Sequence, residues 1–194
     1  MQKIIVKYIS TDYVEKNLDY ILSCLDEDRI KKGKRYLNKN DQLLSFGAGY
    51  LIKKYIGKTE IFNSKNGKLY AKDGPFFNVS HSGNLAIIAL SEDREIGVDI
   101  QLIKENDINP IQYVSEENYP INEMFQIWSN KESLIKCLGS NMSIIKEVPG
   151  LPLTGNREYL KEDFYTHSII FEGYSISVTL KGKEPFEMVL EKVI

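Results

Sequence analysis

Cysteine is scarce in this chain of 194 residues. Cys24 and Cys137 lie far apart, and neither belongs to a CxxC pair or stands beside a cluster of histidines. Disulfide frameworks and zinc sites need grouped cysteines, so we expect two free thiols, as in proteins of the reducing cytoplasm.

Long hydrophobic runs are missing as well. No apolar stretch approaches the roughly 20 residues that a helix needs to cross a bilayer. The first six residues, MQKIIV, alternate like a strand and lack the apolar segment and cleavage site of a signal peptide. We therefore expect a soluble, cytoplasmic protein that has no membrane partner.

Neither sign of charge is in large excess, because 25 basic and 27 acidic residues leave a net charge of −2 at pH 7. Such a balance gives no general attraction to nucleic acid, so any basic surface must be local. The densest run is 29–35, where five of seven residues are basic, followed by Tyr36. This run could bind phosphates or an acidic protein, or it could be the solvated face of a helix.

Common nucleotide-binding and hydrolase motifs are absent: the chain has no Walker loop, no GxGxxG and no GxSxG. Ser80 and His81 are adjacent, but in an extended segment they point to opposite faces and cannot form a nucleophile–base pair. His81 shares a face with Phe77 and Val79, so a buried histidine with satisfied hydrogen bonds is one interpretation.

The hydrophobic pattern predicts both helices and strands. Helices are expected at 13–25 with Asp12 as N-cap, from about 40 to 55 before Gly57, and at 122–138 before Gly139. Strands are expected at 3–9, 61–62, 69–70, 76–82, 85–90, 96–101, 143–148, 167–171, 174–180 and 186–194. The polar segment 104–120 is expected to connect two halves, and the glycines at 47 and 49 to allow close packing or the approach of a ligand.

The strand predicted at 96–101 is the most informative segment. Its isoleucines and valine fall on one face, and Gly97, Asp99 and Gln101 fall on the other. A glycine beside two oxygen-bearing side chains suggests open space for a metal ion or a phosphate. An edge strand with a solvated polar face fits the same pattern.

Glu132 and Lys136 lie four residues apart, so they share one face of the predicted helix, where a simple salt bridge would explain them. Together with Asp99, Glu132 also supplies the one or two carboxylates that Mg²⁺ usually takes from a protein when substrate phosphates complete its coordination. The residue types therefore suggest a metal-assisted site for a diphosphate.

Four motifs carry a resemblance to a known family. They are Gly67-Lys68, FNVSHS at 77–82, IGVDI at 96–100 and WSNKESLIK at 128–136. In type, order and spacing they resemble the 4′-phosphopantetheinyl transferases of the surfactin-synthetase type, over most of residues 25–140.

The resemblance implies transfer of the 4′-phosphopantetheine arm of coenzyme A to a serine of an acyl or peptidyl carrier protein, with release of adenosine 3′,5′-bisphosphate. It also implies a monomer with an α+β fold, made of two similar halves in a pseudo-twofold arrangement. Each half is expected to be a small, mostly antiparallel sheet packed with a long helix. The expected halves are residues 1–103, with the basic segment and the strands of FNVSHS and GVDI, and residues 104–194, with the WSNKES helix.

The same resemblance assigns the site. Asp99 and Glu132 would hold Mg²⁺, Glu132 would also act as general base, and Lys136 would stabilise phosphate charge. The expected contacts of coenzyme A are Arg29, Lys32, Ser45, Lys68, Ser80 and His81.

Gln101 departs from the family pattern, because many members have a glutamate two residues after the motif aspartate. Its neutral oxygen can still serve Mg²⁺ or a bound water, but weaker metal affinity is expected. A catalytically weak homologue that binds coenzyme A or a carrier protein is therefore an alternative, as is an unrelated α/β binding protein. The identity of the carrier is open.

Overall fold

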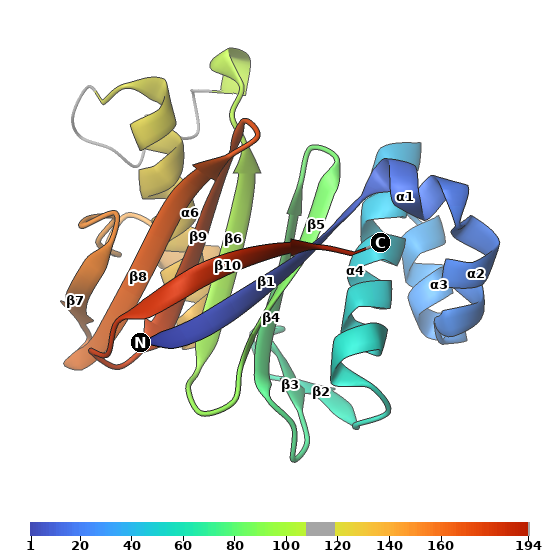
Figure 1. Ribbon diagram of the computed structural model, residues 1–194, viewed down its shortest axis with the longest axis horizontal. Coiled ribbons are helices and arrows are strands. Elements are labelled where there is room, and N and C mark those ends of the chain that lie inside the picture. Colours follow the sequence, from blue (N-terminus) through green and yellow to red (C-terminus); the bar gives the residue numbers. More distant parts are fainter. Residues whose placement is uncertain (108–118, 194) are drawn as a thin grey trace.

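The computed structural model describes residues 1–107 and 119–193 and has an α+β fold, as predicted (Figure 1). The helices are α1 (Thr11–Lys16), α2 (Leu18–Cys24), α3 (Glu27–Lys34), α4 (Lys39–Ile56) and α6 (Ile121–Leu138), with short 3₁₀ turns η1 (Glu105–Asp107) and η2 (Met142–Ile144). The strands are β1 (Gln2–Ser10), β2 (Ile61–Asn63), β3 (Leu69–Ala71), β4 (Phe76–Ser82), β5 (Leu85–Ser91), β6 (Ile96–Leu102), β7 (Gly155–Tyr159), β8 (Glu162–Phe171), β9 (Tyr174–Lys181) and β10 (Phe186–Lys192).

Two four-stranded sheets form the centre of the molecule. The first sheet has the order β10-β1-β5-β4, in which β1 pairs in parallel with β10 and the other pairs are antiparallel. The second sheet, β6-β9-β8-β7, is antiparallel throughout. A separate hairpin joins β2 to β3.

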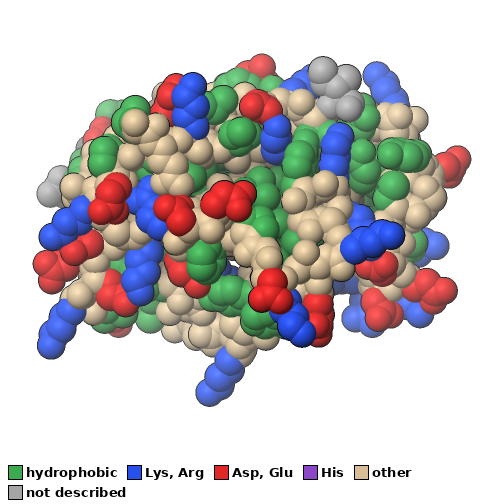
Figure 2. All heavy atoms as spheres, turned by 60° about the horizontal axis from the view of Figure 1, so that its bottom comes forward, with side chains coloured by type: hydrophobic (Ala, Val, Ile, Leu, Met, Phe, Trp, Pro, Cys, Tyr) green, Lys and Arg blue, Asp and Glu red, His purple; other side chains and the backbone are tan. Residues whose placement is uncertain are grey.

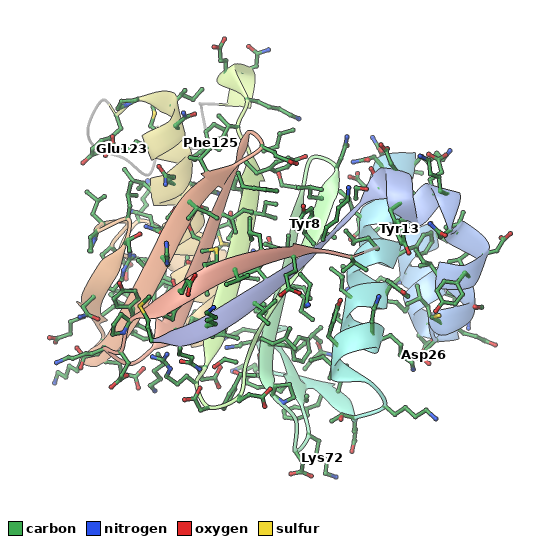
Figure 3. All side chains as sticks on the ribbon, viewed as in Figure 1. Tyr8, Tyr13, Asp26, Lys72, Glu123 and Phe125 are labelled. Carbon is green, nitrogen blue, oxygen red and sulfur yellow. The ribbon has the colours of Figure 1, made fainter. Side chains whose placement is uncertain are left out.

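The two sheets pack face to face, and helices cover their outer faces (Figure 1). Ile87 of the first sheet and Val98 and Val178 of the second are fully buried between them. On the other side of the first sheet, α4 packs on Phe77 and other strand residues, while α6 packs on the outer face of the second sheet. Side chains fill the space between these layers (Figure 3).

The predicted helix at 13–25 is instead two short helices, which break at Asn17. Ser10, not Asp12, caps the first of them, because its Oγ accepts a hydrogen bond from the backbone N–H of Tyr13. The two long predicted helices are confirmed as α4 and α6, and they end as expected at Gly57 and Gly139, both with positive φ.

The strand predicted at 143–148 is wrong. This segment begins as the 3₁₀ turn η2, from which Ile144 and Ile145 pack on the core beneath α6. The apolar residues are therefore buried from a turn instead of from a strand. The polar strand β7 was not predicted; Arg157 is its one buried residue.

The division into halves at residues 103 and 104 stays a prediction, as does the pseudo-twofold relation. Each sheet contains strands from both sides of that boundary. β6, from before residue 103, lies at the edge of the second sheet, and β10, from the end of the chain, completes the first sheet. Part of the predicted connector 104–120 lies outside the described residues. In the described ranges, no helix is long and apolar enough to span a membrane.

Candidate active site

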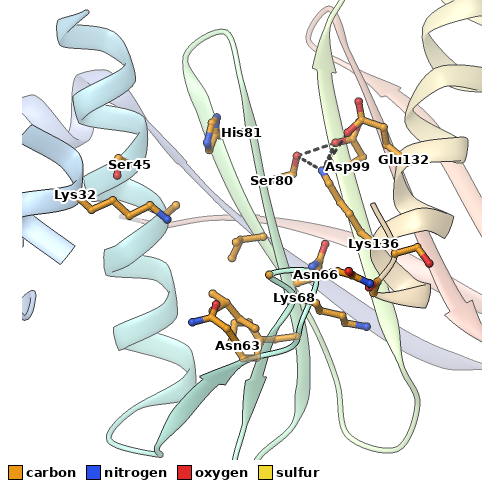
Figure 4. A pocket seen from close by; sticks show the side chains of 18 of the residues that line it. Lys32, Ser45, Asn63, Asn66, Lys68, Ser80, His81, Asp99, Glu132 and Lys136 are labelled. Atoms are coloured by element: carbon orange, nitrogen blue, oxygen red, sulfur yellow. Dashed lines mark hydrogen bonds and ion pairs between the residues drawn. The ribbon is translucent and has the colours of Figure 1, made fainter. Parts of the chain in front are cut away.

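A cavity of about 610 Å³ lies between α3, α4, β4, β6 and α6. It is lined by all ten residues predicted for the site, which are Arg29, Lys32, Ser45, Lys68, Ser80, His81, Asp99, Gln101, Glu132 and Lys136. Figure 4 shows Lys32 and Ser45 on one side, Glu132 and Lys136 on the other, and Ser80 and His81 on the strand between. The outer surface has no such organisation in the view of Figure 2, where acidic and basic side chains are interspersed.

Asp99 is the centre of a buried polar cluster. Its carboxylate is almost inaccessible, with 1% of the residue exposed. Its Oδ1 accepts hydrogen bonds from Ser80 Oγ at 2.8 Å and from Lys136 Nζ at 2.5 Å, and Lys136 Nζ also lies 2.9 Å from Ser80 Oγ. The cluster therefore joins the first sheet, the second sheet and α6 at one point.

Glu132 enters the same cluster from α6. Its Oε2 lies 3.5 Å from Lys136 Nζ, which confirms the ion pair expected from their spacing. Burial raises the pKa of Glu132 to about 7; the charge of Asp99 adds to this effect and Lys136 opposes it. Burial also acts to lower the pKa of Lys136, but the neighbouring carboxylates outweigh it and raise that pKa.

The cluster has the oxygen donors that Mg²⁺ prefers. The amide nitrogen of Gln101 lies 2.8 Å from Oδ2 of Asp99 and 3.4 Å from Oε1 of Glu132, so both carboxylates converge on one point. A rotation of the Gln101 amide would place its oxygen there instead. Among the described residues no group of three or more His, Cys, Asp and Glu side chains could hold a metal ion, so a metal here would have two carboxylates at most.

Gly97 does not provide open space beside Asp99, and that interpretation is wrong. A Cβ at this position would lie 2.0 Å from the carbonyl oxygen of Ser133 and 2.3 Å from the backbone nitrogen of Cys137. The backbone of α6 therefore packs directly on β6. This contact brings Glu132 and Lys136 close to Asp99.

The basic run 29–35 divides between the two interpretations given above. Arg29 and Lys32 line the cavity, whereas Lys31, Lys34 and Arg35 are exposed to solvent. The Arg29 side chain packs against α4 at Gly49, where a Cβ would lie 2.8 Å from its Nε. The glycine thus allows close packing.

An unpartnered hydroxyl marks the basic end of the cavity. Arg29 Nη2 donates to the backbone oxygen of Ser45 at 3.0 Å, and burial lowers the pKa of Arg29. Ser45 is 4% exposed, and within the described part of the chain its Oγ has no hydrogen-bond partner. A buried hydroxyl without a partner is costly unless a ligand satisfies it.

Ser80 and His81 point in different directions, as the extended segment predicts. Ser80 is buried against Asp99, whereas His81 is exposed at the cavity wall. The interpretation of His81 as a buried histidine is therefore wrong. Its exposure leaves the ring accessible to a ligand.

Lys68 lines the cavity with its chain but directs its ammonium elsewhere. Nζ donates to the carboxylate of Glu95 and, at 2.7 Å, to the backbone oxygen of Cys137 in the last turn of α6. Asn66 adds a bond from Nδ2 to the backbone oxygen of Gly139 at 2.9 Å. The β2–β3 turn therefore caps carbonyl groups at the C-terminus of α6, where a cation is also favoured by the helix dipole.

Several polar residues that line the cavity were not assigned to the site from the sequence: Tyr36, Asn63, Asn66, Asn78 and Ser140. Tyr36 directly follows the basic run that was expected to bind phosphates or an acidic protein. Asn66 precedes Gly67 in a turn, and Asn78 lies within FNVSHS, so both stood in segments already singled out. No local pattern marks Asn63 or Ser140.

Several curated proteins are similar to this chain in sequence. The chain is 30% identical to the 4′-phosphopantetheinyl transferase gsp of Aneurinibacillus migulanus over 145 residues, which are 65% of this chain and 61% of that protein. It is 28% identical to the transferase ffp of Bacillus subtilis over 158 residues, covering 71% of this chain and 70% of that protein. It is also 25% identical to HetI of a Nostoc species, with 72% and 70% covered. No family model matches the chain.

The chain is therefore similar to several curated 4′-phosphopantetheinyl transferases, in agreement with the resemblance of its motifs. Two of its relatives, gsp and ffp, are of the surfactin type. The alignment with gsp spans less than two thirds of the length of that protein.

Proposed function

We propose that this protein transfers 4′-phosphopantetheine from coenzyme A to a serine of an acyl or peptidyl carrier protein. The observation that carries the proposal is a cavity with acidic groups at one end and basic groups at the other, in a chain similar to 4′-phosphopantetheinyl transferases. Two carboxylates and Gln101 lie at one end, and cations with an unpartnered hydroxyl lie at the other. A substrate with a diphosphate and a separate phosphate fits both ends.

Asp99 and Glu132, with the oxygen of Gln101, are the proposed ligands of Mg²⁺. Bound there, the ion would neutralise charge on the diphosphate of coenzyme A. Lys136 Nζ forms ion pairs with both carboxylates. It would therefore donate to phosphate oxygens bound beside them.

Glu132 is the proposed general base. Without metal its pKa is about 7, and the oxygen of its carboxylate that Mg²⁺ does not hold would take the proton of the carrier serine. The serine oxygen forms a new bond to the phosphorus that carries the pantetheine arm. The bond from that phosphorus to the bridging oxygen breaks, and adenosine 3′,5′-bisphosphate leaves.

The opposite end of the cavity is the proposed site of the other phosphate and the adenosine. Arg29, Lys32 and the Ser45 hydroxyl would hold the 3′-phosphate, and the side chain of Lys68 would lie by the adenine. Ser80 and His81 would contact the diphosphate. Arg29 has a buried, unpartnered Nε and Ser45 a buried, unpartnered Oγ, which supports an anion at this end.

One feature of the site supports the alternative of a catalytically weak homologue. Gln101 donates its amide to both carboxylates and supplies no negative charge, so a metal must compete with that arrangement. Such a protein would bind coenzyme A or a carrier protein without efficient transfer. We further propose that the protein acts as a monomer in the cytoplasm, in keeping with its two free cysteines.

The mass of an apo carrier protein tests the proposal after incubation with this protein, coenzyme A and Mg²⁺. The expected result is a gain of one phosphopantetheine that is lost with EDTA and in Glu132→Ala, but kept in Glu123→Ala on the same helix outside the cavity. Coenzyme A binding without any gain across several carriers would favour the weak homologue.

A further inference from the structure

Strands β4 and β6 lie side by side at the edges of different sheets, and side chains join them where no backbone ladder does. Asn78 Oδ1 accepts from the backbone N–H of Val98 at 3.0 Å, and Ser82 Oγ accepts from that of Leu102 at 2.9 Å. Between them, Ser80 Oγ donates to Asp99. Asn78, Ser80 and Ser82 thus form a row on one face of β4.

The row satisfies backbone groups that β6 cannot satisfy by itself. An edge strand has N–H groups on its free side, and burying them without acceptors is costly. Asn78 and Ser82 supply two acceptors, spaced four residues apart on β4 and four apart on β6. Equal spacing fixes the offset of one strand along the other, which the non-directional apolar contacts between the sheets do not do.

This offset matters because the two sheets hold different parts of the cavity. Arg29, Ser45 and His81 belong to the first sheet or to the helices that cover it, whereas Asp99 belongs to the second sheet and Glu132 to its helix. A slip between β4 and β6 would move the anion-binding end of the cavity relative to the carboxylates, and it would leave each set intact.

We propose that Asn78 and Ser82 are positioning residues that hold the two walls of the cavity in register for transfer; this rests on the proposed function. Ser82 does not line the cavity, and the Oδ1 atom of Asn78 is engaged with Val98. Both residues therefore act through the placement of β6, on which Asp99 and Gln101 lie.

Ser82→Ala and the double variant Asn78→Ala/Ser82→Ala test the proposal, and Ser82→Thr serves as the conservative variant that keeps the hydroxyl. Ser91→Ala is the matched control: its Oγ also accepts a backbone N–H, that of Arg94 at 3.2 Å, but it lies outside the cavity at the end of β5. Thermal unfolding identifies any variant that fails to fold.

The first measurement is the exchange rate of single backbone amides by NMR, which needs no activity. In Ser82→Ala, Leu102 is expected to exchange about fivefold faster or more, as expected when a net contribution of about 1 kcal/mol is lost. The rate should return in Ser82→Thr, and Val178 in β9 should keep its rate. Unchanged exchange at Leu102 would overturn the proposal.

The second measurement separates kcat from KM. In the double variant we expect kcat to fall about tenfold and the KM for coenzyme A, which would contact both walls, to rise severalfold, while the half-saturating Mg²⁺ concentration stays within about twofold, because the carboxylates keep their own arrangement. Ser91→Ala should change none of these. Faster exchange with an unchanged kcat would overturn the positioning role.

A wild-type protein that transfers to no carrier would count against the proposed function. The positioning role is then tested by the binding of coenzyme A analogues that span both ends of the cavity. Weaker binding in the double variant, with unchanged binding of adenosine 3′,5′-bisphosphate, supports it. Equal loss or no loss for both ligands overturns it.

Discussion

Lys136 Nζ lies 2.5 Å from Oδ1 of Asp99, although the two residues belong to different elements, α6 and β6. The carboxylate is buried and Lys136 is its cationic partner, so the pair contributes to the fold as well as to the proposed chemistry.

Removing one member of this pair is expected to destabilise the protein. Lys136→Met leaves the Asp99 carboxylate buried and without its cation, at a cost of about 3–5 kcal/mol in the free energy of unfolding. The double variant Lys136→Met/Asp99→Asn should recover much of that loss, since neither charge remains. Urea unfolding measures both, and a loss below about 1 kcal/mol in the single variant would show that the pair contributes little.

Stability in the absence of metal should depend on pH through Glu132. Its pKa is about 7 in the folded protein against an ordinary value of 4.5. Between these values the folded protein holds a proton that the unfolded chain has released, so stability falls as the pH rises through this window, by up to about 3 kcal/mol.

The melting temperature of metal-free protein between pH 4.5 and pH 8 checks this dependence. Glu132→Gln cannot titrate, so its melting temperature should fall less over the same range. Parallel curves for the two proteins would contradict the assignment of the transition to Glu132.

Gln101→Glu should lower the Mg²⁺ concentration needed for half-maximal transfer. The substitution adds a third negative charge where two carboxylates already converge. Asn156→Asp, which adds the same charge on exposed β7 surface outside the cavity, is the control. An unchanged or increased Mg²⁺ requirement in Gln101→Glu would argue against a role of this residue near the metal.

Gly97→Ala is expected to displace α6 from β6. The new methyl group would overlap the Ser133 carbonyl and the Cys137 nitrogen, and overpacking of this kind costs about 1–3 kcal/mol or more. The transfer rate should fall by more than the loss of folded protein explains, because Glu132 moves with the helix. Gly47→Ala in α4 is the milder comparison, because its new Cβ would lie 3.2 Å from the nearest side-chain atoms. Equal losses of stability and transfer in the two variants would contradict a special role of the contact at Gly97.

Carrier docking is expected to involve the exposed part of the basic run or Lys53-Lys54. Carrier domains are acidic around their serine, so Lys31→Glu/Lys34→Glu should raise the KM for the carrier severalfold at low salt and leave the KM for coenzyme A unchanged. Lys183→Glu on the distant β9–β10 turn is the control. A carrier KM equal to that of the control would exclude docking at 31–34.

Much of the site followed from local patterns and motifs. The alternation of residues 96–101 placed Asp99 and Gln101 on one face, and the helical spacing placed Glu132 beside Lys136. Each of these relations depends on residues close in sequence, where the period of a strand or helix decides the direction of a side chain.

The relations that no local pattern predicts depend on contacts distant in sequence. The space beside Gly97 is filled by a helix more than 30 residues away, and the ammonium of Lys68 is captured by Glu95 and Cys137. The pairing of β10 with β1 joins the two ends of the chain. No hydrophobic period encodes such partners, and the same holds for the bonds from Asn78 and Ser82 to β6.

The amount of adenosine 3′,5′-bisphosphate released per molecule of modified carrier tests the central claim most directly. We expect equal amounts of the two products, formed together, with neither product when the carrier serine is replaced by alanine or Glu132 by alanine. Release of the nucleotide without modification of the carrier, or modification that persists in Glu132→Ala, would contradict it.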